Sequence, residues 1–201
     1  MMIPGGYQSV FERVPKVYDN LSKEYPIFKG HYGKAKSILA SPLMNYTGLT
    51  GIYAPFTREA NINTAILPQT IPSTTLHEMG HQRGFAEEEA CNFLAYLAST
   101  YSGDADIRYS GALLALACTS QALYKTQYDT LVLLNQTIDE KVMKDIQQNN
   151  DFWQSYEGQV EEVSSSINNS YLKANGISDG VESYGRMVDL LLDYYVTYIK
   201  P

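Results

Sequence analysis

The sequence predicts a mainly helical α+β fold with a small sheet, in a single domain that covers residues 1–201. Apolar residues recur at three- and four-residue intervals through most of the chain, which is the spacing of one face of a packed helix. One segment is instead rich in Thr, Ile and Tyr, as strands are. The 201 residues are 44% hydrophobic and 18% charged, which is enough for one core and demands no second domain.

The first part of the chain alternates between helical and extended patterns. Between Tyr7 and Phe28 the apolar residues follow helical spacing. Pro15 is expected to end or kink the first part of that helix, because proline cannot donate a backbone hydrogen bond. In order, we expect a helix over 7–28, a short helix over 34–39, a strand over 47–56 and a partner strand over 61–67.

Helical spacing dominates the rest of the chain. Pro72 followed by Ser73 is a start signal for a helix that ends near Gly84. Near the C-terminus, Asp179 and Glu182 fit a capping box that begins a final amphipathic helix. Between these two helices we expect four more, over 88–101, 109–125, 128–148 and 152–172. The helix over 128–148 can be interrupted.

The composition narrows the class of protein. The formal net charge of -7 and the pI near 4.9 argue against nucleic acid as a partner, since binding its phosphates needs a basic surface. The apolar stretches are shorter than the roughly 20 residues that cross a bilayer, and the chain as given opens without a secretory signal pattern. We expect a soluble chain, with Cys91 and Cys118 as buried packing residues rather than a disulfide.

The segment 77–81, with the sequence His-Glu-Met-Gly-His, carries the chemistry. Residues four apart on a helix project from one face, so His77 and His81 can bind one tetrahedral zinc ion. Glu78 lies off that face, within reach of the water that the ion activates, and is the expected general base. An accidental helix surface should show this pattern in roughly one chain of this length in a hundred. The remaining histidine, His31, is assigned no role.

A catalytic zinc site needs a third protein ligand, and three consecutive glutamates follow the motif. In an unbroken helix Glu88 would lie about 10.5 Å along the axis from His81, so the helix must turn. Gly84 is the expected C-cap, because glycine adopts the left-handed conformation that ends a helix. We choose Glu88 as the third ligand over Glu87, which has the spacing of the last histidine in His-Glu-x-x-His-x-x-Gly-x-x-His metalloproteases.

Other side chains are expected to support this site. Asn92 lies four residues after Glu88 on the same helix face, so we expect it to hydrogen-bond and orient the Glu88 carboxylate from behind. Glu89 is interpreted as a solvated residue of the helix N-terminus. Tyr184 or Tyr109 is a candidate hydrogen-bond donor to the tetrahedral intermediate, although a structural role is favoured for any single member of the 17 tyrosines.

The segment from Pro72 to Leu97 resembles a bacterial zincin-like family catalogued as domain of unknown function 3810. The stretch Glu-Asp-Glu-Ala-Asn that is usual in the family falls on residues 88–92, which supports Glu88 as a ligand, and this chain departs from it at Ala90. The spacing from Glu88 to Asn92 is also similar to the Glu-x-x-x-Asp of gluzincins, by analogy only. The resemblance to the family covers roughly residues 25–195 and includes the segments 51–63, 109–111 and 183–185.

The resemblance implies a zinc-dependent peptidase with a zincin-like fold of the gluzincin type. It implies His77, His81 and Glu88 as the ligands of the zinc ion. It also implies a location at the cell membrane for the full-length protein, with this chain as a soluble domain behind an anchor that the chain lacks.

We therefore predict a zinc-dependent metallohydrolase, a peptidase with Zn²⁺ as cofactor, a peptide or protein as substrate and Glu78 as general base. The segment 48–57 is a candidate edge strand for peptide binding by strand addition, with an ordinary core strand as the alternative. A non-catalytic peptide-binding or regulatory module is an alternative function, but it would not need Glu78. A zinc amidase is another, because the motif specifies water activation rather than a leaving group.

Overall fold

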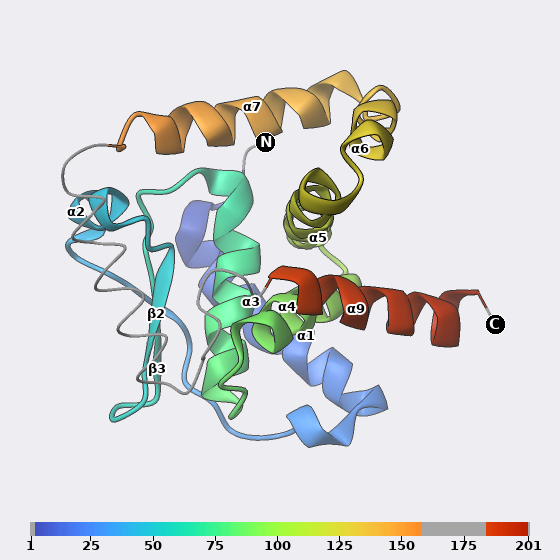
Figure 1. Cartoon of the computed structure of the whole chain (residues 1–201). Coiled ribbons are helices and arrows are strands. Elements are labelled where there is room, and N and C mark those ends of the chain that lie inside the picture. Colours follow the sequence, from blue (N-terminus) through green and yellow to red (C-terminus); the bar gives the residue numbers. More distant parts are fainter. Residues whose placement is uncertain (1–2, 158–183, 201) are drawn as a thin grey trace.

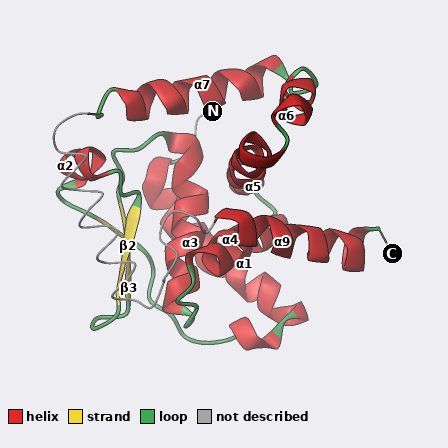
Figure 2. Ribbon diagram, in the orientation of Figure 1, coloured by secondary structure: helices red, strands yellow, loops and turns green. Residues whose placement is uncertain are grey.

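Helices make up most of the computed structural model, which describes residues 3–157 and 184–200 (Figure 1; Figure 2). The sheet has three short strands, so the prediction of a mainly helical α+β fold with a small sheet is confirmed. The described helices are α1 (Gly6–Glu24), α2 (Ser41–Met44), α3 (Ile71–Gln82), α4 (Glu88–Thr100), α5 (Ala105–Thr126), α6 (Tyr128–Asn135), α7 (Glu140–Gln154) and α9 (Tyr184–Tyr194). The strands are β1 (Lys36–Ser37), β2 (Gly51–Ala54) and β3 (Glu59–Ile62).

Helix α1 continues through Pro15, so of the two predicted effects of this proline, an end or a kink, the end is wrong. The proline removes one backbone hydrogen bond and costs roughly 3 kcal/mol in a helix interior. The buried face of α1 includes Val10, Val14 and Leu21, each 0% exposed, and burying such side chains contributes roughly 1.5–3 kcal/mol each. Packing therefore outweighs the lost bond. The helix ends before its predicted limit, ahead of Pro26, because the residue before a proline disfavours the helical conformation.

The predicted short helix over 34–39 is wrong, because this segment contains strand β1. β1 runs parallel to β3, and just beyond it the amide of Ile38 donates to the carbonyl of Ile62 at 2.9 Å. So short a helix could not offset the cost of its own nucleation, whereas pairing with β3 satisfies these backbone groups. Pro42 then lies in the first turn of α2, where its missing N–H would have no helical partner.

Strands β2 and β3 form an antiparallel pair where the sequence predicts two strands. Their register pairs Gly51 with Ile62. β2 lies inside the predicted 47–56, while β3 begins ahead of the predicted 61–67. The strand order β1-β3-β2 puts β2 at an edge of the described sheet, as expected for the segment 48–57.

Helix α3 lies at the centre of the molecule, packed against β2, β3, α1, α4 and α5 (Figure 1). Its first turn contains Pro72, as the start signal predicts. Leu76 and Met79 are 0% exposed and anchor the helix in the core. After the helix ends, Gly84 takes a φ of 96°, which confirms the left-handed turn predicted there. Because α3 is covered on several sides, its polar side chains face neighbouring elements rather than bulk solvent.

The remaining helices follow the predicted order. α4 matches the prediction closely, α5 begins somewhat earlier than predicted, and the helix expected over 128–148 is divided into α6 and α7. Most of the helix predicted over 152–172 lies outside the described residues, as do Asp179 and Glu182 of the predicted capping box. Helix α9 accounts for the described part of the final helix.

Two further expectations concern the state of the cysteines and the presence of a membrane-spanning helix. Cys91 and Cys118 are both buried and free, as predicted. Within residues 3–157 and 184–200, no helix has both the length and the apolar character that crossing a bilayer requires.

Candidate metal centre

Helices α3 and α4 bring the three predicted ligands together. His77 and His81 lie one turn apart on α3, so their rings project from the same face. The chain turns at Gly84, and Glu88 is the first residue of α4. Because α4 packs back against α3, the Glu88 carboxylate returns to the two histidines.

The three side chains place their donor atoms at the spacing of a metal site. The Nε2 atoms of His77 and His81 are 3.1 Å apart. Glu88 lies 3.0 Å from the first of these nitrogens through Oε2 and 3.5 Å from the second through Oε1. Four ligands placed tetrahedrally at about 2.0–2.1 Å from a zinc ion are about 3.3 Å from one another. The observed spacing therefore fits zinc.

The outer nitrogen of each imidazole is already hydrogen-bonded. Nδ1 of His81 lies 2.8 Å from the backbone carbonyl of Phe85, which can only accept, so this nitrogen carries the proton. Nδ1 of His77 lies 2.8 Å from Oδ1 of Asn92, which favours the same tautomer. In the neutral rings both Nε2 atoms are then unprotonated, and their lone pairs face each other and the Glu88 carboxylate. Such a group of acceptors needs a cation among them.

In the metal-free chain, the pKa shifts of the two histidines and of Glu88 also indicate that this site attracts positive charge. Burial lowers the pKa of His77 and of His81. The hydrogen bonds to Glu88 and the charges of the nearby carboxylates together outweigh this effect, so both pKa values are raised overall. Burial raises the pKa of Glu88, but the two histidines together move it well below its usual range. Glu88 is therefore ionised beside groups that attract either protons or a metal ion.

The three consecutive glutamates have three different environments. Glu88 reaches both histidines, whereas Glu87 is exposed at the N-cap of α4. The expectation of a solvated Glu89 is wrong, since it is only 2% exposed and its Oε1 has no hydrogen-bond partner in the part of the chain that the structure describes. Helix α4 packs against α1, α3, α5 and α9, so its first turn is covered on more than one side.

Asn92 supports the site through a different partner from the one predicted. Its Oδ1 contacts the outer nitrogen of His77 instead of the Glu88 carboxylate. The reason is that Glu88 turns inward to the two Nε2 atoms, so the side chain one turn further along α4 meets the outer edge of the His77 ring. This contact fixes the orientation of the ring and its tautomer.

Glu78 lies beside the three donors but turns toward strand β2. It is 6% exposed, and this burial raises the pKa of its carboxyl group despite the opposing charges of the two histidines. The nearby backbone of Tyr53 offsets a small part of this rise in the pKa of Glu78. A carboxyl group with a raised pKa can exchange a proton closer to neutral pH than an exposed one.

Three residues of the site escaped the sequence reasoning. The ring of Tyr53 stacks on His81, with centroids 6.2 Å apart and planes 19° apart. Cys91 places Sγ 3.3 Å from Nδ1 of His81, and burial raises the pKa of its thiol to about 12, so it stays neutral. Only Cys91 left a sequence signal, because it follows Glu88 by three residues on one helix. Tyr53 depends on tertiary folding, whereas the carbonyl of Phe85 reaches His81 locally, across the turn at Gly84.

Tyr109 and His31 take no part in this cluster. The hydroxyl of Tyr109 donates to Asp145 of α7 at 2.6 Å, so the structural interpretation is favoured for it. The side chain of Tyr184 lies outside what the structure describes. His31 is exposed and is not one of the converging donors.

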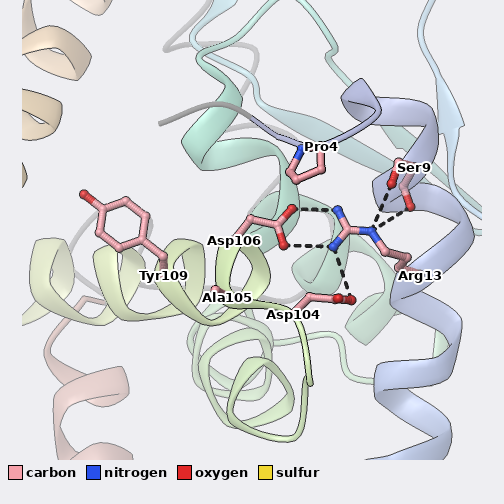
Figure 3. Close-up of a pocket in the computed structure, with 7 residues that line it drawn as sticks. All are labelled: Pro4, Ser9, Arg13, Asp104, Ala105, Asp106 and Tyr109. Carbon is pink, nitrogen blue, oxygen red and sulfur yellow. Dashed lines mark hydrogen bonds and ion pairs between the residues drawn. The ribbon is translucent and has the colours of Figure 1, made fainter.

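A cavity of about 610 Å³ lies apart from these residues, between α1 and α5 (Figure 3). The guanidinium group of Arg13 donates to both carboxylate oxygens of Asp106, at 2.8 and 2.6 Å. It also pairs with Asp104 at 3.2 Å. The charged groups of the cavity are thus engaged with one another, and we interpret them as a clamp that joins the two helices.

A model of the family described as "Protein of unknown function (DUF3810)" matches residues 4–192. The match runs from α1 into α9 and includes both helices of the candidate metal centre. No curated protein and no solved structure matches the chain.

Proposed function

The chain belongs to the DUF3810 family, whose function is unknown, and on this premise we propose that it is a zinc-dependent metallohydrolase that cleaves peptide bonds. The proposal rests on one observation, the convergence of donor atoms from His77, His81 and Glu88 within 4.8 Å of one another. Two imidazoles and one carboxylate, with a fourth position left open, are a ligand set of catalytic zinc sites.

The chemistry of the donors favours zinc over other common ions. Two of the three donors are imidazole nitrogens, whereas Ca²⁺ and Mg²⁺ prefer oxygen ligands. The outer nitrogens of both rings are hydrogen-bonded, to Asn92 and to the carbonyl of Phe85, as is usual for histidines that bind a metal. The spacing of the inner atoms fits the tetrahedral geometry that zinc adopts.

Glu78 is the proposed general base. When bound, zinc supplies Lewis acidity, which activates a water molecule and polarises the carbonyl under attack. Glu78 lies beside the donors without being one of them, so its carboxylate can accept a proton from the attacking water and return it to the leaving amine. In the metal-free chain, burial raises the pKa of this carboxyl group.

The finer parts of the proposal have their own support. A helix with two histidine ligands, followed by a turn at Gly84 and a glutamate at the start of the next helix, supports a zincin-like fold of the gluzincin type. Strand β2, at the edge of the described sheet and packed on α3, supports a peptide substrate, since extended peptides bind to sheet edges.

The experiment compares the parent chain, loaded with zinc, with two variants on a library of unstructured peptides read by mass spectrometry. Glu78→Gln keeps the size of the side chain but cannot accept a proton. We expect it to bind zinc like the parent and to lose about 10²–10⁴-fold in turnover. The matched control is Glu87→Gln, which changes an exposed glutamate and should cleave like the parent.

Each other outcome has a definite meaning. Turnover by Glu78→Gln at the parent rate would contradict the mechanism. A parent chain that holds zinc and captures peptides without cleaving them would favour the non-catalytic module. Hydrolysis of small amides without cleavage of peptides would favour the zinc amidase.

A further inference from the structure

We propose that strand β2 is a positioning element for the general base, in which Gly51 makes room for the Glu78 side chain. The inference rests on the proposed function for the role of Glu78. The contact between the strand and this side chain is independent of that function.

Gly51 lies against Glu78 so closely that a larger residue would displace the Glu78 side chain. A Cβ atom built at Gly51 would lie 2.6 Å from both Cγ and Oε1 of Glu78, and 2.9 Å from Cδ. Gly51 is not among the glycines with positive φ, so its backbone conformation is open to any residue. The three nearest atoms that a methyl group would meet all belong to the Glu78 side chain. Glycine here therefore serves the position of the carboxylate rather than a special turn.

The hydrogen-bond pattern of the sheet explains why this part of β2 faces the base. Opposite residues of an antiparallel pair alternate between bonding the partner strand and pointing away from it. Just before β2, the carbonyl of Thr50 accepts a bond from the amide of Asn63 at 2.9 Å, so the backbone groups of Ile52 also point toward β3. Those of Gly51 and Tyr53 then point to the outer edge of the sheet, and Gly51 itself lies against the Glu78 side chain.

Tyr53 connects the strand to one of the predicted ligands. It lies two residues after Gly51, which contacts the Glu78 side chain, and its ring stacks on the imidazole of His81. Strand β2 thus contacts two neighbouring groups of the site, the base and one ligand.

The first test is Gly51→Ala, with Gly103→Ala as the matched control because a Cβ at Gly103 would meet nothing within 4 Å. We expect Gly51→Ala to bind about one zinc per chain and to keep KM within about twofold, while kcat falls at least about tenfold, because a base displaced by an ångström loses its alignment. The control should match the parent in all three. An unchanged kcat in Gly51→Ala would overturn the proposal.

A second test needs no activity and uses thermal unfolding. We expect Gly51→Ala to lower the Tm of the parent chain but to leave the Tm of a Glu78→Ala chain nearly unchanged, because the atoms that the new methyl would meet are then gone. An equal loss in both backgrounds would overturn the proposal. If the parent cleaves no substrate, the proposed function fails, and this cycle still decides whether β2 positions Glu78.

Discussion

The Nε2 atoms of His77 and His81 lie 3.1 Å apart, with the Glu88 carboxylate in contact with both. Hydrogen bonds on the opposite side of each ring direct these two nitrogens inward as acceptors. Three acceptors in contact repel one another in a poorly solvated site. The arrangement is therefore stable only with positive charge at its centre, supplied by protons or by a metal ion, and the two compete for the same atoms.

This competition predicts that zinc stabilises the chain less as the pH falls. The pKa values of His77 and His81 are raised above 6.5. In the metal-free chain, their protonation therefore contributes stability that is full below the unfolded value and is lost as the pH rises through the raised values. Zinc needs the unprotonated nitrogens. The difference in Tm between zinc-loaded and chelator-treated protein should thus shrink between about pH 8 and about pH 6.

The expected size of this difference can be stated. At about pH 8, with free zinc at about one hundred times its Kd, binding contributes about 2.7 kcal/mol, which raises the Tm of a chain of this size by roughly 5–10 °C. The His81→Ala variant should show no difference at either pH. A difference in the parent that stays constant across this range would contradict the competition.

Substitution of Asn92 should weaken zinc binding without abolishing it. Asn92 orients His77 through a bond of 2.8 Å to the outer nitrogen, and loss of such a partner typically lowers metal affinity by about 10–100-fold. We expect this fall for Asn92→Ala, measured by competition with a chromogenic chelator. Asn92→Asp keeps an acceptor for the ring N–H and should retain most of the affinity. Equal affinity for Asn92→Ala and the parent would show that the contact does not matter.

The clamp between α1 and α5 should contribute to stability in a pH-dependent way. Hydrogen bonds from Arg13 lower the pKa of Asp106, so the contribution is present above the unfolded pKa and is lost as the pH falls through the lowered value. At neutral pH, Asp106→Asn should lower the free energy of unfolding by about 2–3 kcal/mol. The control is Glu12→Gln in the exposed pair with Lys34, which should cost less than about 1 kcal/mol. Equal losses in the two variants, measured by urea unfolding, would refute the role of the clamp.

Much of the candidate site could be predicted from the sequence because its signals are local. The spacing from His77 to His81 fixes one helical face. Gly84 marks the turn that the distance to Glu88 requires. Both features depend on neighbours in the chain, and the structure has the helix, the left-handed glycine and the approach of Glu88 to both histidines.

The errors concern contacts that only tertiary packing decides. The segment around Ile38 has weak helical spacing, but pairing with β3 takes its backbone hydrogen bonds. Glu89 has the polarity of a surface residue, yet α4 is enclosed by other helices. The prediction gives Asn92 the wrong partner, because helical spacing shows on which face of the helix Asn92 lies but not the direction in which the Glu88 side chain turns. Tyr53 lies far from the motif in sequence, and only the fold brings it to His81.

The most direct test of the central claim is the zinc content of protein purified without chelators, measured by elemental analysis for the parent and for Glu88→Ala and Glu87→Ala. The account predicts about one zinc per chain in the parent and in Glu87→Ala, and a much lower content in Glu88→Ala. A parent chain that binds no zinc, even after zinc is added, would contradict the metal centre. Loss of zinc with Glu87 instead of Glu88 would contradict the assignment of the third ligand.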